Sequence, residues 1–370
     1  MGIRKAIFSQ NCFFVQQEIM ITEEQVLRAL SHVDDPDLKK DLVTLGMIQQ
    51  LKIGDSISFD LVLTTPACPM KDMMVNACRN AIALMVDKNI PVHINATSKV
   101  SSSRTGSEVL TGVKNVIAVG SGKGGVGKST VAVALALALS KTGAKVGLLD
   151  ADIYGPSIPT MFGIRHAPEM VERDGKQCIV PVQKNGISLL SIGFMAAPEQ
   201  AIVWRGPMIS SAFRQFINDT LWGELDYLVI DLPPGTGDVQ ITLSQMVPLT
   251  GLVIVTTPQE VAKADARRAI NMFKMPAINK PILGVVENMA YFQPADAPDK
   301  KYYIFGTGGG KQLAEEQNIP YLGELPLQEI IRQQSDEGVI DTLSEAFKPF
   351  DTLAAEVARQ VSIVNSQNLS

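Results

Sequence analysis

The chain has 370 residues, of which 46% are apolar, and its 33 basic against 38 acidic side chains give a net charge of -5. This is the composition of an ordinary globular protein of about two domains, and it excludes the disordered and fibrous classes. No dense Lys/Arg run is present, which argues against a dedicated nucleic-acid binder, because neutralising phosphates requires a basic stripe.

Cysteine usage and hydropathy bear on the compartment. The four cysteines, Cys12, Cys68, Cys78 and Cys178, are spread over the chain. Their sparseness predicts no disulfide framework and favours a reducing cytoplasm. No apolar run approaches the roughly 20 residues of a membrane-spanning helix. We therefore expect a cytoplasmic protein that binds neither membrane nor nucleic acid.

Residues 1–21 are expected to be a tail or a mis-assigned start. A signal peptide is not indicated, because Ser9, Gln10 and Asn11 interrupt the apolar core of this segment and leave it too short. Met20 stands almost directly before the first strong helix signal, so a start at that methionine fits the pattern.

Residues 22–97 are expected to form a small α+β domain. Thr22 with Gln25 three residues on is a capping box that opens a helix. Residues 51–65 alternate in hydropathy around a Gly-Asp turn, which predicts a hairpin, and residues 74–86 return to helical periodicity. Residues 98–112 are rich in Ser, Thr and Gly, a composition that predicts a flexible linker.

Residues 113–364 are expected to form an α/β domain, followed by a tail at 365–370. Short apolar runs alternate there with helical stretches, a pattern typical of a mostly parallel sheet covered by helices on both faces. These runs are residues 116–120, 146–150, 227–231, 252–257 and 282–287.

A glycine-rich loop follows the first of these runs. Residues 121–130, Ser-Gly-Lys-Gly-Gly-Val-Gly-Lys-Ser-Thr, satisfy G-x-x-x-x-G-K-S and open an Ala/Leu-rich helix. Inward-turned backbone amides and the helix dipole make such a loop a phosphate site, with Lys128 on the β/γ-phosphates and Ser129 on Mg²⁺. We therefore expect this P-loop NTPase domain to bind a nucleoside triphosphate together with Mg²⁺. The expected nucleotide contacts from the loop are Gly122, Lys123, Gly124, Gly125, Val126, Gly127, Lys128, Ser129 and Thr130.

Lys123 is not required by the generic motif, and in an ordinary loop it would be a solvated charge. Here the loop resembles that of the deviant Walker ATPases, a family of dimeric proteins that includes MinD, ParA and the nitrogenase iron protein. The resemblance implies that Lys123 reaches the nucleotide of the partner subunit, in a role like that of an arginine finger. A homodimer is then part of the chemistry.

Acids follow two further strands at the edge of the sheet where ligands bind. Asp152 is the candidate to orient the attacking water, while Asp150 is either close to the metal or structural. Asp231 is expected to be a Walker-B acid that holds Mg²⁺ through water, ahead of a switch segment at 232–238. Asn288 and the Thr257-Pro258 loop match positions that hold adenine in the resembling ATPases, although Asn288 could equally satisfy its own turn.

Several longer motifs narrow the family. SGKGGVGKST, LLDADIYGPSIPTMFG, DYLVIDLPPGTGD, VVENMAYF and YIFGTGGG resemble the Mrp/ApbC iron–sulfur cluster carrier ATPases. DDPDLKKDLVTLGMI and TTPACPMKD resemble the small domain, similar to SufT and PaaD, that precedes the ATPase in bacterial members. The resemblance implies a slow ATP hydrolase that delivers clusters to apo iron–sulfur proteins, alone or with assembly factors.

The chain departs from that family at one motif. Members commonly carry Cys-x-x-Cys after the ENM segment, through which two subunits share a [4Fe–4S] cluster, but residues 287–305 contain no cysteine. Cys68, on a loop between a strand and a helix, is the remaining candidate ligand, and Cys78 is expected to be buried in a helix. The alternative is an ATP-gated dimeric adaptor that holds no cluster.

Overall fold

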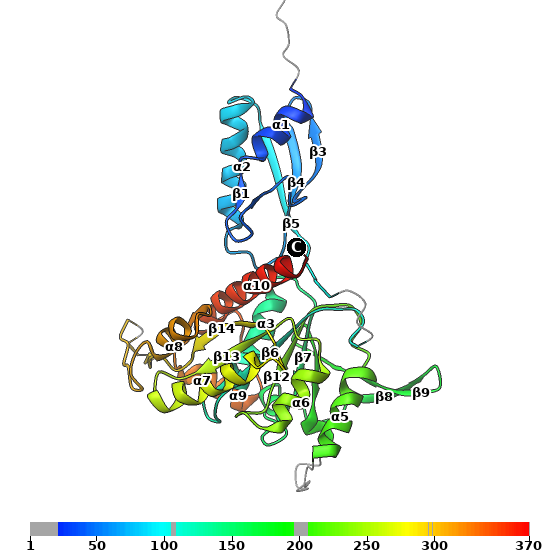
Figure 1. Cartoon of the computed structure of the whole chain (residues 1–370), viewed down its shortest axis with the longest axis vertical. Coiled ribbons are helices and arrows are strands. Elements are labelled where there is room, and N and C mark those ends of the chain that lie inside the picture. The colour runs from blue at the N-terminus through cyan, green and yellow to red at the C-terminus, as the bar shows by residue number, and fades with distance from the viewer. Residues whose placement is uncertain (1–20, 105–108, 196–205, 295, 298, 370) are drawn as a thin grey trace, which may run out of the picture. The chain divides into compact units, whose positions relative to one another are not determined.

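The computed structural model describes residues 21–104, 109–195, 206–294, 296–297 and 299–369 (Figure 1). These residues fall into two compact units. One contains the chain up to Leu61 together with Met73–Asn95, and the other contains Val62–Asp72 together with the chain from Ala96 onward. Across the described ranges, no helix is both long and apolar enough to cross a membrane.

The first unit holds the predicted helices and hairpin. Helix α1 (Glu23–Leu30) begins with the capping box, in which the Gln25 amide donates to Thr22 Oγ1 at 3.3 Å and the Thr22 amide donates to Gln25 Oε1 at 3.0 Å. Strands β3 (Ile48–Ile53) and β4 (Ile57–Leu63) pair antiparallel, which confirms the hairpin. The other elements are β1 (Asp34–Asp35), β2 (Lys40–Asp41), α2 (Lys71–Met85) and β5 (Val92–Ser98), with sheet order β3-β4-β5.

The second unit is built on an eight-stranded sheet of order β10-β11-β7-β12-β6-β13-β14-β15. The strands are β6 (Val113–Ser121), β7 (Val146–Asp150), β10 (Val182–Lys184), β11 (Ile187–Ser191), β12 (Leu225–Asp231), β13 (Gly251–Thr256), β14 (Ile282–Glu287) and β15 (Tyr321–Glu324). All neighbours pair parallel except β10, which pairs antiparallel with β11. The five predicted apolar runs are the central strands, so the α/β prediction is confirmed.

Helices cover both faces of this sheet (Figure 1). One apolar cluster joins α3 (Lys128–Lys141) and α10 (Lys348–Leu369) to the sheet, and α3 is buried on all sides between Val131 and Leu139. A second cluster lies on the opposite face under α5 (Gly206–Asn218), α6 (Asp238–Met246), α7 (Glu260–Lys274) and α8 (Gly309–Gln317). The remaining elements are α4 (Ile158–Met161), α9 (Glu329–Glu337), two short 3-10 turns at Ile192–Met195 and Glu345–Phe347, and the hairpin of β8 (Glu169–Arg173) with β9 (Lys176–Val180).

Three expected boundaries differ from the structure. Val62–Asp72 belongs with the second, larger unit rather than with the small domain. The expected linker is tied down at residues 98–104, because the buried Asn365 side chain donates to the Ser101 carbonyl at 3.0 Å and accepts from the Ser103 amide at 3.2 Å. The expected tail is the last turn of α10, which runs to Leu369. Polar side chains of the expected linker and of the expected tail therefore form hydrogen bonds between the two segments. The expected N-terminal tail, except for residue 21, lies outside the described residues.

Candidate functional site

The carboxyl ends of β6, β7 and β12 meet at one edge of the sheet, where the glycine-rich loop joins β6 to α3. Gly125 and Gly127 have φ of +82° and +79°, a left-handed conformation that side-chain-bearing residues rarely adopt. The loop borders a cavity of about 540 Å³. At this border lie Lys123, Gly124, Gly125, Gly127, Lys128, Ser129 and Thr130.

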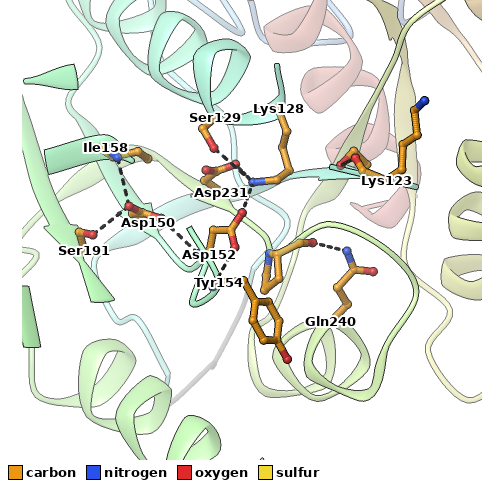
Figure 2. A network of polar contacts seen from close by, with 12 residues as sticks. Lys123, Lys128, Ser129, Asp150, Asp152, Tyr154, Ile158, Ser191, Asp231 and Gln240 are labelled. Atoms are coloured by element: carbon orange, nitrogen blue, oxygen red, sulfur yellow. Dashed lines mark hydrogen bonds and ion pairs between the residues drawn. The ribbon is translucent and has the colours of Figure 1, made fainter. Parts of the chain in front are cut away.

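Lys128 is the centre of a buried ion cluster (Figure 2). Its Nζ lies 2.7 Å from Asp231 Oδ1, 3.1 Å from Asp152 Oδ2 and 3.3 Å from Ser129 Oγ. The structure thus brings together the predicted phosphate lysine, water-orienting acid, Walker-B acid and magnesium hydroxyl. Burial raises the pKa of Asp231, while the charge of Lys128 opposes that rise.

One oxygen of Asp231 remains open for a further ligand. Asp231 Oδ2 is buried and has no hydrogen-bond partner among the described residues. A buried acceptor without a donor is costly unless something else fills the position. Together with the Ser129 hydroxyl nearby, an oxygen-only donor pair of this kind suits a hydrated Mg²⁺ ion.

Asp150 is held entirely by protein groups (Figure 2). Its Oδ2 accepts from Ser191 Oγ at 2.8 Å and from the Ile158 amide at 3.3 Å, and its Oδ1 accepts from the Asp152 amide at 3.1 Å. Burial, and then the charge of Asp231, raise the pKa of Asp150 to about 7. These contacts favour the structural role for Asp150, as the anchor of the loop that presents Asp152. Ser191 was not predicted, because nothing in its sequence context marks it.

Lys123 points away from this cluster (Figure 2). Its ammonium group makes no hydrogen bond or ion pair within the described part of the chain, although the side chain is half-buried. A lysine directed away from its own phosphate site is compatible with a role on another molecule.

Asn288 and Pro258 lie in different surroundings. Asn288 borders the cavity, and its Nδ2 donates to the Val126 carbonyl of the phosphate loop at 2.8 Å. Pro258 is not among the described residues that line the cavity; it packs instead on the start of α8, where a Cβ on Gly309 would lie 2.2 Å from the Pro258 carbonyl oxygen. The adenine contact by Pro258 stays a prediction.

Part of the cavity wall was missed in the sequence. It includes Leu327, Gln328 and Ile331, which lie at the start of α9 and line the cavity together with residues of the phosphate loop. The signal was present, because LPLQEII directly follows β15 at the ligand-binding edge of the sheet. The glycines of FGTGGG, by contrast, form the start of α8. The buried Glu287 carboxylate accepts there from the Gly308 amide, at 3.1 Å, and from the Gly310 amide.

The cysteines of the described ranges do not form a ligand set. Cys68 is half-buried in the Val62–Asp72 segment of the larger unit, where Thr65 Oγ1 lies 3.2 Å from the Tyr227 hydroxyl. Cys78 is buried in α2, as predicted, and burial raises its thiol pKa to about 12. Cys178 is half-buried on β9, and Cys12 lies outside the described residues. In the part of the chain that the structure describes, no three His, Cys, Asp or Glu side chains are grouped to hold a metal.

Known proteins are similar to this chain over most of its length. The family model described as ParA, NUBPL iron-transfer P-loop NTPase, matches residues 112–362, and the model described as iron-sulfur cluster assembly protein matches residues 23–93. An iron-sulfur cluster carrier protein of Synechocystis is 47% identical over 352 residues, which cover 93% of this chain and 99% of that protein. The chloroplastic Fe-S cluster assembly factor HCF101 of Arabidopsis thaliana is 40% identical over 381 residues, covering 99% of this chain and 69% of that protein.

A solved structure shares the fold. The nucleotide-binding protein of Archaeoglobus fulgidus, determined in complex with ADP, is 40% identical and superposes with a TM-score of 0.55, covering 65% of this chain and 92% of that one. The site consists of a phosphate loop whose lysine contacts two acids. The family model for such proteins matches more than half of the sequence. The chain belongs to the NUBPL iron-transfer family of P-loop NTPases.

Proposed function

We propose that the chain is a homodimeric, Mg²⁺-dependent ATPase that carries iron–sulfur clusters and delivers them to apoproteins in the cytoplasm. The observation that carries the nucleotide part is the convergence of Lys128, Asp152 and Asp231 at the phosphate loop. The cargo part is supported by similarity to a named carrier protein over 93% of the chain.

The residues of the cluster have separable tasks. Lys128 exchanges its carboxylate partners for the β/γ-phosphates, and Ser129 and Asp231 hold the hydrated cation. Mg²⁺, when bound, supplies charge neutralisation at the phosphate oxygens. Asp152, freed from Lys128, orients water toward the γ-phosphate, while Lys123 of each subunit reaches the nucleotide of its partner. ATP is preferred to GTP in this proposal, because the sequence contains no Asn/Thr-Lys-x-Asp guanine motif.

The cluster is cargo, and the described residues of one chain include no group of three His, Cys, Asp or Glu side chains that could hold it. A stable cluster generally needs four thiolates, whereas residues 287–305 have no cysteine. We propose that Cys68 from each of two subunits contributes to holding the cluster, with the remaining ligands from cysteines other than Cys178 or from an assembly partner. The same observation favours the second candidate, a dimeric adaptor whose ATP state sets partner affinity and which holds no cluster.

Anaerobic reconstitution with iron and sulfide separates the two candidates. The carrier should take up iron and sulfide in stoichiometric amounts, lose them in Cys68→Ala but not in Cys178→Ala, and activate an apo iron–sulfur protein. Cys178 is a matched control because it is also half-buried and lies on a different element. A colourless protein whose ATP turnover rises with a partner would support the adaptor instead, and failure to bind ATP would overturn both.

A further inference from the structure

Two carbonyl groups of the phosphate loop are held by buried side chains. The Ser121 hydroxyl donates to the Lys123 carbonyl at 2.9 Å, and the Asn288 amide donates to the Val126 carbonyl at 2.8 Å. Ser121 ends β6 and Asn288 directly follows β14, strands that flank β13 in the sheet. The exposed fractions of the two residues are 1% and 6%; the Asn288 contact is buried and the Ser121 contact is partly buried.

Each contact also sets the direction of an amide group. A trans peptide is planar, and its C=O and N–H bonds point in opposite directions. Fixing the Lys123 carbonyl therefore fixes the Gly124 N–H, and fixing the Val126 carbonyl fixes the Gly127 N–H. Both glycines border the nucleotide cavity. Phosphate binding by such a loop depends on amides that already point at the anion.

The approach of Asn288 depends on a glycine in the loop. Gly127 has φ of +79°, and a Cβ at this position would lie 2.2 Å from Asn288 Nδ2. The Asn288 amide thus rests directly on the backbone at the start of α3. The backbone N–H of Asn288 donates to the Thr256 carbonyl at 2.8 Å, and this hydrogen bond anchors Asn288 to the end of β13. The side chain is therefore held against the loop from the sheet.

We propose that Ser121 and Asn288 are positioning residues that pre-organise the phosphate loop, so that Asn288 acts on the triphosphate through the Val126 peptide and not through the base. The inference rests on the proposed function, in which this loop binds ATP. It replaces the expectation that Asn288 recognises adenine. Loss of either contact leaves a carbonyl free to turn toward the phosphates, which weakens binding of any polyphosphate.

The test compares ATP with inorganic tripolyphosphate, which has no base, by calorimetry on the full chain in Mg²⁺. Asn288→Ala and Ser121→Ala should each weaken ATP and tripolyphosphate by the same factor, about threefold to tenfold, as expected for one lost hydrogen bond. Ile331→Ala is the control: Ile331 lines the cavity from α9, outside the loop, and its replacement should weaken ATP alone.

Each other outcome is decisive. If Asn288→Ala weakens ATP but not tripolyphosphate, its role is on the base and the inference is wrong; unchanged affinities for both ligands also overturn it. A wild-type chain that binds ATP but no tripolyphosphate would show that the loop is not pre-organised. A wild-type chain that binds neither ligand refutes the proposed function itself. Thermal unfolding checks each variant, and Ser121→Ala, which removes a single oxygen, carries the test if Asn288→Ala does not fold.

Discussion

Lys128 lies between two carboxylates that compete with phosphate for its charge. Its Nζ is 2.7 Å from Asp231 and 3.1 Å from Asp152. In the proposed mechanism, nucleotide has to displace these contacts, and a bound Mg²⁺ ion would offset the charge of Asp231 once Lys128 has moved to the phosphates. The charge of Lys128 is therefore already matched by carboxylates before nucleotide binds.

Asp231→Asn should accordingly have opposite effects on two measurements. In EDTA, ATP affinity should rise severalfold, because one anion next to the phosphate site is removed. In Mg²⁺, hydrolysis should be lost, because the cation loses its carboxylate. Fluorescent-nucleotide titration and phosphate release measure the two effects. Asp226→Asn is the control: it removes the carboxylate that lies 2.7 Å from Lys114, elsewhere in the unit, and should change neither measurement. Weaker binding of ATP by Asp231→Asn in the presence of EDTA would contradict the displacement argument.

Lys123→Ala should leave ATP binding within severalfold of wild type but lower hydrolysis by about 10³-fold or more, as for a finger residue supplied in trans. The Lys123 ammonium has no partner among the described residues, so its removal should not disturb the fold. Mixing Lys123→Ala with Lys128→Ala tests the trans role directly. In the mixed dimer, the Lys128→Ala subunit supplies Lys123 to the intact site of its partner. Recovery of turnover is expected, and no recovery would place Lys123 in its own site.

Asp150 predicts a pH dependence of stability. Its pKa is raised from 3.8 to about 7, first by burial and then by Asp231. Over that interval the folded chain binds a proton that the unfolded chain has released, so this group makes the free energy of unfolding fall as pH rises. Urea unfolding at several pH values between these two pKa values should show a shallower fall of the free energy of unfolding in Asp150→Asn than in wild type. The slope is the test, because the variant also exchanges one acceptor for a donor; an unchanged slope would mean that Asp150 stays ionised.

At the scale of elements, the phosphate loop is packed directly against α7. A Cβ on Gly122 would lie 2.1 Å from the carbonyl carbon of Asp265, whereas a Cβ on Gly124 would meet no atom within 4 Å. The first glycine of the motif therefore allows helix packing, in addition to any contact it makes with phosphate. Two glycines of one loop have different physical roles.

Gly122→Ala should consequently force the loop and α7 apart, because neither backbone can yield locally. We expect a lower thermal unfolding midpoint and loss of ATP binding. Gly124→Ala is the matched control in the same loop, and its unfolding midpoint should stay close to that of wild type. Equal midpoints for the two variants would contradict the close packing of Gly122 on α7.

At the scale of the whole molecule, the last turn of α10 joins the C-terminal end of the larger unit to residues 101–103, where the chain enters that unit. Asn365 Nδ2 donates to Asn115 Oδ1 at 2.9 Å and to the Ser101 carbonyl at 3.0 Å, and Asn365 Oδ1 accepts from Ser103 Oγ at 2.9 Å. Chain segments 250 residues apart are joined in this way. The segment 98–104 is thus part of the unit rather than a free tether.

Asn365→Ala should loosen this closure. Removing the amide leaves buried partners unsatisfied, at a cost of about 1 to 3 kcal/mol. Hydrogen exchange should quicken at residues 101–104 with little change in the central strands. Asn368→Ala, which loses only a 3.4 Å exposed contact to Ser103, is the control. Equal exchange in both variants would show that apolar packing of α10 alone holds the segment.

The sequence by itself determined the local features. Apolar runs predicted the central strands, glycine spacing predicted the phosphate loop between β6 and α3, and the capping box predicted the start of α1. These signals are readable because the interacting residues are neighbours in the chain. β11 and β15 were not predicted, since short apolar runs without a flanking motif do not distinguish strand from helix.

Only the tertiary structure decided which side chains meet. Lys128 and Asp231 are 103 residues apart, and Asn288 and Val126 are 162 residues apart. Strand order places β7, β12, β6 and β14 so that their carboxyl ends share one edge, and that order is not written in any local pattern. The tertiary structure places the Asn288 side chain against the Val126 carbonyl, Pro258 against the start of α8, and the Ser191 hydroxyl on the Asp150 carboxylate. The physical reason is that sheet neighbours are chosen by burial of the whole core, whereas propensity and spacing act over a few residues.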